Sequence, residues 1–477
     1  MGNCMEMEFY AVDLANKLGA DYAEARIERR YTSNILYRNG RVEAYRYGSS
    51  YGIGIRVLVN GGLAFTSTNI LDKDNVERIV RDAVKIAKNA SKRAIKSIKM
   101  SEEKLVSARW ESKFKQNPFD VSLEEKIELF KVFDSILKDI GVFPSRSYNF
   151  STSFLKKRFT NSEGIVVEGK RLDTYISYSI IAFKPGKGSV YRWNSFAGTV
   201  GWELIKDEKP EKYLMEEAKK MQEILDKAIK PPINESLDIV LGSEVVGLMV
   251  HESCGHPSEA DRIMGREAAQ AGESYMKPDM LGKRIGTRVV NICDDPTIPK
   301  SYGFYLYDDE GIKARKRELF KNGYINEFLH NRETAAIFGV NSNGSARASS
   351  YNREPIIRMA NTYFVPGDYS LEELIEDVHR GVYIKSYMEW NIDDRRWSQR
   401  YVGLEAYLIE NGELKRLVKN PALEITTGGL YSSIDAVGKD LKFYPGTCGK
   451  GDPGQGVPVW FGGPSIRLRN VMLSISL

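Results

Sequence analysis

Two of the four histidines in this sequence stand close together, in the segment HESCGH that runs from His251 to His256. Neutral imidazole is a good zinc ligand, and zinc lowers the pKa of a bound water molecule from about 15.7 to about 7. A carboxylate that is not itself a ligand can take a proton from that water as it attacks a carbonyl carbon. Glu252 supplies such a carboxylate. The segment therefore predicts a metal site for hydrolysis.

The spacing of the two histidines sets a condition on the backbone. Residues four apart, as in an HExxH motif, lie about 40° apart around an α-helix, whereas residues five apart lie about 140° apart. His251 and His256 can therefore reach one metal ion only if the helix widens or ends between them. Gly255 and Pro257 permit this, because glycine tolerates unusual backbone angles and proline interrupts helical hydrogen bonding. We predict a distorted helical turn here.

A catalytic zinc needs a third protein ligand besides the two histidines. Cys448 is one candidate, since it lies in a glycine-rich stretch that we expect to be a turn, and Lys450 nearby favours its thiolate. A small buried thiol without a ligand role is an equally good interpretation of Cys448. Cys254, inside the motif, is the rival ligand. The sequence pattern leaves the choice between these two cysteines open.

The remaining polar candidates are weaker. His330 follows a strand-like stretch, and His379 ends an amphipathic helix, where a cation complements the helix dipole. Glu259 and Asp261 follow the motif closely enough to orient one of its histidines. Three acidic pairs stand among turn-forming residues, and we expect them to be solvated. The pairs are Asp294-Asp295, Asp308-Asp309 and Asp393-Asp394.

The N-terminal half alternates between helical and strand-like periodicity, and the order of elements occurs twice. Each time a helix precedes strand-like segments and a second helix follows them, which predicts two repeated α-β-α units over residues 1–94 and 105–230, joined by the charged stretch from Ile95 to Lys104. Four helices are expected: Met5 to Leu18, one that begins after an N-cap at Asp72 or Asp74, one near Glu124 to Ile140, and one near Pro210 to Ile229. Asn39-Gly40 and Asn60-Gly61 mark hairpin turns, and strands extend from Tyr148 to Trp202.

The pattern changes near Lys230-Pro231-Pro232, where we place the boundary between an N-terminal α+β domain (1–230) and a C-terminal domain (231–477). The second part is rich in glycine, aromatic and β-branched residues, which predicts a mostly antiparallel β domain. Within it, Leu237 to Gly242 is typical of a strand, and Ser243 to Met249 of the helix that leads into the metal motif. Other expected elements are a helix from Ser370 to His379 and turns at Lys321-Asn322-Gly323, Glu410-Asn411-Gly412 and Thr427-Gly428-Gly429.

Bulk properties exclude several classes of function. The net charge is +5, from 69 basic and 64 acidic residues spread along 477 positions, which does not indicate nucleic-acid binding. The four cysteines form no CxxC pair and suit a reducing compartment rather than a disulfide framework. No run approaches the roughly 18 apolar residues that span a bilayer. We therefore expect a cytoplasmic protein that binds neither membranes nor nucleic acids.

Several separated segments resemble the TldD/PmbA family of metallopeptidases. HESCGH with Glu259 and Asp261 is similar to the family's HExxxH segment. Further similar stretches follow in the same order, and together they cover most of the sequence from Leu237 to Leu477. They are YDDEG (Tyr307 to Gly311), Arg347 to Asn352, RMANTYFVPGD (Arg358 to Asp368) and TCGKGDPGQGVPVWFGGPSIR (Thr447 to Arg467). One departure is SYMEWNID, from Ser386 to Asp393, where the family tends to have a glycine-rich segment.

The resemblance implies a complete site and an activity. Its zinc ligands would be His251, His256 and Cys448, which favours Cys448 over Cys254, and Glu252 would be the catalytic base. It implies an α+β N-terminal region, a mostly β C-terminal domain that carries the metal, and a dimer. The partner would be a second copy or a paralogue that lacks HExxxH. The implied substrates are short or unfolded peptides in extended conformation.

Two other functions fit the same residues. One is a regulatory or binding protein with a structural zinc, which would close the coordination sphere with a fourth protein ligand such as Cys254. The other is an amidohydrolase acting on a small molecule, which would differ from a peptidase only in the shape of its pocket. Glu252 argues against the first, because a structural site has no use for an unligated carboxylate beside the metal.

Overall fold

The computed structural model describes residues 7–94, 96–233, 235–267 and 272–475. Met5, Ile95 and Cys4 lie outside the described residues. The chain combines helices with mostly antiparallel sheets, so the α+β prediction is confirmed. No helix in the described ranges is long and apolar enough to cross a membrane.

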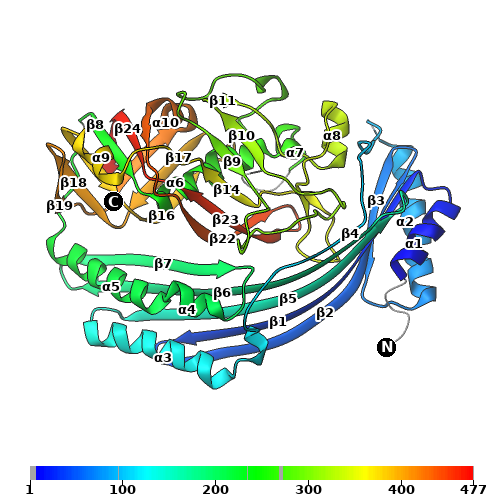
Figure 1. Cartoon of the computed structure of the whole chain (residues 1–477), viewed down its shortest axis with the longest axis horizontal. Coiled ribbons are helices and arrows are strands. Elements are labelled where there is room, and N and C mark those ends of the chain that lie inside the picture. Colours follow the sequence, from blue (N-terminus) through cyan, green and yellow to red (C-terminus); the bar gives the residue numbers. More distant parts are fainter. Residues whose placement is uncertain (1–6, 95, 234, 268–271, 476–477) are drawn as a thin grey trace.

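One long, curved seven-stranded sheet dominates the N-terminal half and runs beneath the C-terminal sheets (Figure 1). Its strands are β1 (Tyr22–Arg38), β2 (Arg41–Val59), β3 (Gly62–Thr68), β4 (Ala108–Glu111), β5 (Ser145–Asn161), β6 (Val166–Lys184) and β7 (Gly188–Gly198). The Asn39-Gly40 and Asn60-Gly61 turns join β1 to β2 and β2 to β3, and all four residues have positive φ, as type I′ hairpin turns require. Both predicted hairpins are confirmed.

Helices flank this sheet at its two ends (Figure 1). They are α1 (Met7–Lys17) and α2 (Lys73–Ser91) at one end, and α3 (Leu123–Ile140), α4 (Glu203–Glu208) and α5 (Pro210–Lys227) at the other; a short 3-10 turn, η1 (Pro118–Asp120), precedes α3. Asp72 is the N-cap of α2, and its side chain accepts a hydrogen bond from the Asn75 amide. The strands of both predicted repeats share one sheet, since β1 pairs with β5. The division into domains at residue 230 stays a prediction.

Within the described residues, the C-terminal half contains four smaller sheets. Two have six strands, in the orders β11-β10-β9-β14-β23-β22 and β19-β18-β15-β8-β24-β21; one has four, β16-β17-β20-β25; and β12 pairs with β13. Of the described pairs in this half, only β14–β23 and β8–β15 are parallel. The strands are β8 (Leu237–Leu241), β9 (Ile292–Asp294), β10 (Arg317–Lys321), β11 (Tyr324–Ile325), β12 (Ala346–Arg347), β13 (Ile356–Ile357), β14 (Asn361–Phe364), β15 (Arg380–Ile384), β16 (Tyr387–Ile392), β17 (Ser398–Gly403), β18 (Ala406–Glu410), β19 (Glu413–Leu417), β20 (Pro421–Thr426), β21 (Ile434–Val437), β22 (Lys442–Lys450), β23 (Gln455–Gly463), β24 (Ile466–Val471) and β25 (Leu473–Ile475).

Short helices connect these sheets, and several of them differ from the sequence predictions. The expected turn at residues 427–429 is the beginning of α10 (Thr427–Ser433), because the Thr426 side chain accepts a hydrogen bond from the Gly429 amide and starts a helix. The helix α8 (Arg332–Phe338) was not predicted. The helix expected from Ser370 to His379 is the shorter α9 (Leu371–Glu376), which begins with a capping box between Ser370 and Glu373. The other helices are α6 (Ser243–Val250), α7 (Ala260–Ile263) and the 3-10 turn η4 (Pro278–Met280).

Candidate metal centre

The helix α6 brings the metal motif into the middle of the C-terminal core. It follows β8 directly, and all eight of its residues are buried. Its N-cap is Gly242, not Ser243 as predicted. The Cβ of any other residue at 242 would lie 2.6 Å from the Lys385 carbonyl oxygen, so only glycine fits there, and the Ser243 hydroxyl lies 3.3 Å from that of Tyr444 instead.

The helix widens into a π turn, η2 (His251–Gly255), before the 3-10 turn η3 (His256–Ser258). The His256 amide donates a hydrogen bond to the His251 carbonyl, five residues back, as in a π-helix. This wider turn places the two imidazole ring centres 4.9 Å apart. The Cβ of a larger residue at Gly255 would lie 1.9 Å from the Met359 sulfur. The predicted distortion is confirmed, and a tight fit requires glycine within it.

The structure brings Cys448 to this turn from β22. One ligand atom from each of His251, His256 and Cys448 lies within 4.8 Å of the other two, and all three residues are buried. The Cys448 sulfur lies 3.3 Å from Nε2 of His256. Contrary to the sequence prediction, Cys448 does not stand in a turn, because β22 continues to Lys450 and Cys448 pairs with Val457 of β23.

Protonation states in this cluster favour a metal ion. Burial lowers the pKa of both histidines, that of His256 to about 4, so both imidazoles are neutral at neutral pH. Burial raises the pKa of the Cys448 thiol, but His256 and Arg358 outweigh it and lower that pKa to about 7. Nδ1 of His251 is buried without a hydrogen-bond partner among the described residues. Two neutral imidazoles and an easily formed thiolate fit zinc.

The buried carboxylate of Glu259 supports His256 on the Nδ1 side of its ring. Oε2 of Glu259 lies 3.1 Å from Nδ1 of His256 and 2.6 Å from Nε of Arg262. Burial opposes ionisation of Glu259, but Lys450, His256 and Arg262 outweigh it and hold the pKa of that carboxyl well below its usual range. An ionised Glu259 accepts the Nδ1 proton and leaves Nε2 of His256 for a metal. Asp261 supports this arrangement indirectly, because its carboxylate accepts hydrogen bonds from Nζ of Lys450 at 2.7 and 2.8 Å.

Replacing this support should weaken metal binding without abolishing it. We expect Glu259→Gln to lower zinc affinity about 10- to 100-fold, because a neutral amide no longer fixes the His256 ring and its tautomer. Competition with a chromophoric chelator measures the affinity. Glu273→Gln is the matched control, since the Glu273 side chain is 62% exposed. Equal affinity of the two variants would contradict a supporting role for Glu259.

Glu252, the expected base, lies outside the three-residue ligand group and forms an ion pair with Arg396. Oε2 of Glu252 contacts Nη1 of Arg396, and both side chains are buried. The sequence analysis missed Arg396, because nothing in the spacing of residues relates it to a motif 144 positions away. It also missed Arg358, which is fully buried and donates to the backbone carbonyl of Cys448.

The other candidates do not join the cluster. Cys254 is fully buried, and burial raises the pKa of its thiol well above the usual value. His330 is buried beside the Thr334 hydroxyl, and burial lowers its pKa to about 4. His379 is exposed just beyond α9. Among the described residues, the ligand group therefore contains neither Cys254 nor either of these histidines.

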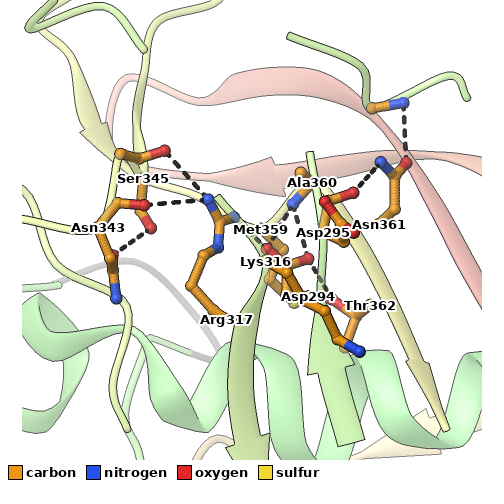
Figure 2. Close-up of polar contacts among 12 residues, drawn as sticks. Asp294, Asp295, Lys316, Arg317, Asn343, Ser345, Met359, Ala360, Asn361 and Thr362 are labelled. Atoms are coloured by element: carbon orange, nitrogen blue, oxygen red, sulfur yellow. Dashed lines mark hydrogen bonds and ion pairs between the residues drawn. The ribbon is translucent and has the colours of Figure 1, made fainter. Parts of the chain in front are cut away.

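The expectation that the acidic pairs are solvated is wrong for two of them. Asp294, the last residue of β9, is fully buried where β9 pairs with β10 and β14 (Figure 2). It contacts Arg317 and accepts hydrogen bonds from the Ala360 amide at 3.0 Å and the Thr362 hydroxyl at 2.9 Å. The Thr362 hydroxyl also lies next to Gly255, so this hydrogen-bond network packs against the π turn.

The second buried pair is Asp308-Asp309, whose side chains bind backbone amides of Ala346 and Ala348 at 3.0 and 2.8 Å. Asp393 fits the original expectation, since it is exposed and caps a turn. Aspartate binds backbone amides equally well in solvated turns and in buried loops, and the sequence pattern does not separate the two.

Comparison with known proteins places the whole chain in one family. Three models of the PmbA/TldA metallopeptidase match it: domain 1 at residues 23–87, the central domain at 116–229 and the C-terminal domain at 234–475. A metalloprotease of Methanocaldococcus jannaschii is 34% identical over 94% of this chain and 96% of its own. A zinc metalloprotease TldD homolog of Saccharolobus solfataricus is 28% identical over 97% of this chain and 98% of its own.

Solved structures share the fold at lower identity. A Thermotoga maritima protein, 19% identical, covers 98% of this chain and all of its own with a TM-score of 0.79. TldE from Thermococcus kodakarensis, 18% identical, covers 99% of this chain and all of its own with a TM-score of 0.74. The matches of the three domain models and of the Methanocaldococcus jannaschii relative over nearly the full length show that this chain belongs to the PmbA/TldA metallopeptidase family.

Proposed function

We propose that this protein is a zinc-dependent peptidase that hydrolyses short or unfolded peptides. In this proposal His251, His256 and Cys448 hold the metal, and Glu252 is the general base. The observation that carries it is the convergence of two imidazoles and one thiol, with ligand atoms within 4.8 Å of one another, beside a carboxylate that is not part of their group. Three protein ligands leave one position of a tetrahedral zinc for water or substrate, as catalysis requires.

Bound zinc would polarise the scissile carbonyl and acidify water. The protein's own contribution begins with Glu252, whose carboxylate accepts a proton from the attacking water and later returns it to the leaving amine. Glu259 keeps His256 in one tautomer. The surrounding core excludes bulk water, because His251, Glu252 and His256 are all buried. In such a dry site, charged groups act on the substrate more strongly than in water.

An extended peptide suits the strand that carries Cys448. β22 is the last strand of its sheet in the described residues, with β23 as its paired neighbour. An end strand can accept a peptide that adds to the sheet through backbone hydrogen bonds, and such binding recognises backbone rather than sequence. We propose this mode for the substrate. We also propose that the protein acts as a homodimer or with a paralogue lacking HExxxH.

A structural zinc in a regulatory protein is less well supported. That alternative needs a fourth protein ligand, and Cys254 was its best candidate. The Cys254 thiol is outside the ligand group, and burial raises its pKa, so it stays protonated. Zinc binds the thiolate, not the thiol.

Removal of the metal tests the proposed function. The purified protein is incubated with a mixture of synthetic peptides, and the products are identified by mass spectrometry. We expect cleavage that stops after dialysis against a chelator and returns when one equivalent of zinc is added. Cleavage that continues in protein shown to be metal-free would contradict a metallopeptidase mechanism.

A further inference from the structure

A buried arginine touches the proposed base. Arg396 lies between β16 and β17, and its guanidinium contacts the Glu252 carboxylate. The two side chains are 8% and 6% exposed. The guanidinium therefore lies against the proposed base, the residue next to His251 in the sequence.

The backbone holds Arg396 in a fixed and unfavourable conformation. Its φ is 64°, in the left-handed region that residues with a side chain rarely adopt. Its amide donates to the Asp393 carbonyl at 3.0 Å, and its carbonyl accepts from the Thr427 hydroxyl at 2.9 Å. The Tyr275 backbone amide donates to the neighbouring Arg395 carbonyl at 2.8 Å. Strained residues that their surroundings hold in place cluster at functional sites.

The charge balance of peptide hydrolysis gives this arginine a role. As water attacks, a C–O bond forms, the carbonyl π electrons move to the carbonyl oxygen, and the water proton passes to Glu252. The negative charge thus leaves Glu252 and appears on the substrate oxygen. Arg396, which contacts Glu252, can follow this charge and pair with the oxygen that gains it, since hydrogen bonds between ionised groups are the strong ones. When the C–N bond breaks, the electrons reform the carbonyl, the amine leaves with the proton, and Glu252 regains its charge.

We propose that Arg396 is a further catalytic residue, which stabilises the oxyanion formed during hydrolysis. This inference rests on the proposed peptidase function. Its structural basis is the contact with Glu252, which places one fixed cation where the negative charge starts. Preorganised charges of this kind act on the transition state without reorganising during the reaction.

A binding experiment tests the inference without turnover. A phosphinic peptide carries a tetrahedral group with anionic oxygens, whereas a mercaptoacyl peptide binds zinc through sulfur and lacks such oxygens. By calorimetry on zinc-loaded protein, Arg396→Ala should lower the affinity for the phosphinic peptide about 100-fold or more, the scale of one lost oxyanion donor. The affinity for the mercaptoacyl peptide should fall less than about threefold. Equal losses for both probes, or no loss for either, would overturn the proposal.

Kinetics give the second measurement. Arg396→Ala should lower kcat about 10²- to 10³-fold with little change in KM, because the interaction forms only in the transition state. Arg396→Lys should recover part of kcat, since it keeps the charge but not the planar fork. Arg395→Ala is the matched control, because that neighbouring side chain is 74% exposed. Zinc content and thermal unfolding are measured for every variant.

The outcomes separate the two proposals. If the wild-type protein with zinc cleaves no peptide, the peptidase function fails, while selective loss of phosphinic-peptide binding in Arg396→Ala still supports the anion-binding role. If the wild-type protein binds no phosphinic peptide, or if Arg396→Ala keeps the wild-type kcat, the role of Arg396 is refuted and Glu252 remains the base. A change in KM alone would assign Arg396 to ground-state binding and would also refute the proposal.

Discussion

Glu252→Gln should abolish most peptide cleavage and leave zinc in place. The amide cannot accept a proton, and the loss of a general base typically costs about 10²- to 10⁴-fold in kcat. Zinc stoichiometry should stay at one per chain, because Glu252 lies outside the group formed by His251, His256 and Cys448. Metal analysis and initial rates on the same preparation measure both quantities.

The ion pair with Arg396 complicates this variant and supplies its control. Removing the Glu252 charge leaves a buried guanidinium without its carboxylate, a change that costs about 3–5 kcal/mol when one partner of a buried pair is removed. We therefore expect a lower Tm, and rates must be measured well below it. Glu252→Asp keeps the charge and should retain more stability than Glu252→Gln. Glu389→Gln, at a 47% exposed side chain, should match the wild type in rate and Tm. Wild-type kcat in Glu252→Gln would refute the general base.

The sequence predicted the local features of the site well, because they depend on neighbouring residues. The spacing from His251 to His256 requires a wider turn, and Gly255 permits it; the structure contains that π turn. The hairpins at Asn39-Gly40 and Asn60-Gly61 follow in the same way, since asparagine and glycine adopt positive φ readily.

Features that depend on tertiary contacts were not predictable from the pattern. Cys448 stands in a strand rather than a turn, because β23 pairs with the glycine-rich stretch and extends it. Asp294 is buried because Arg317 and the Thr362 hydroxyl neutralise and bind its carboxylate. Arg396 approaches Glu252 through the folding of a hairpin. The partners in each case are far apart in the sequence, so composition and periodicity carry no signal for them.

The choice between Cys448 and Cys254 shows the same limit of local reasoning. Cys254 lies inside the motif, only two residues from His256, yet its fully buried thiol is outside the ligand group. Cys448 lies 192 residues from His256, yet its sulfur is 3.3 Å from Nε2 of that histidine. The π turn explains the difference, because its wider spacing brings residues 251 and 256 to one side of the helix.

Replacing Cys448 and replacing Cys254 should have opposite outcomes for zinc binding. Cys448→Ser removes a thiol whose pKa lies at about 7 and replaces it with a hydroxyl that does not ionise near neutral pH. We expect zinc affinity to fall by more than about 100-fold, beyond the loss typical of an outer-shell partner, and peptide cleavage to fall with it. Cys254→Ala should keep the zinc affinity of the wild type within about threefold. Chelator competition measures both variants.

Stability provides the cross-check on this pair. Cys254→Ala removes a fully buried sulfur from the core and should lower the free energy of unfolding by about 1 kcal/mol with or without zinc. Cys448→Ser should change the free energy of unfolding of the metal-free protein little. The variant should lose the stabilisation that zinc gives the wild type, since a ligand stabilises only the state that binds it. Thermal unfolding with and without zinc separates the two. Zinc-dependent stabilisation that survives in Cys448→Ser and disappears in Cys254→Ala would assign the third ligand to Cys254, and the site would then have to rearrange around the π turn.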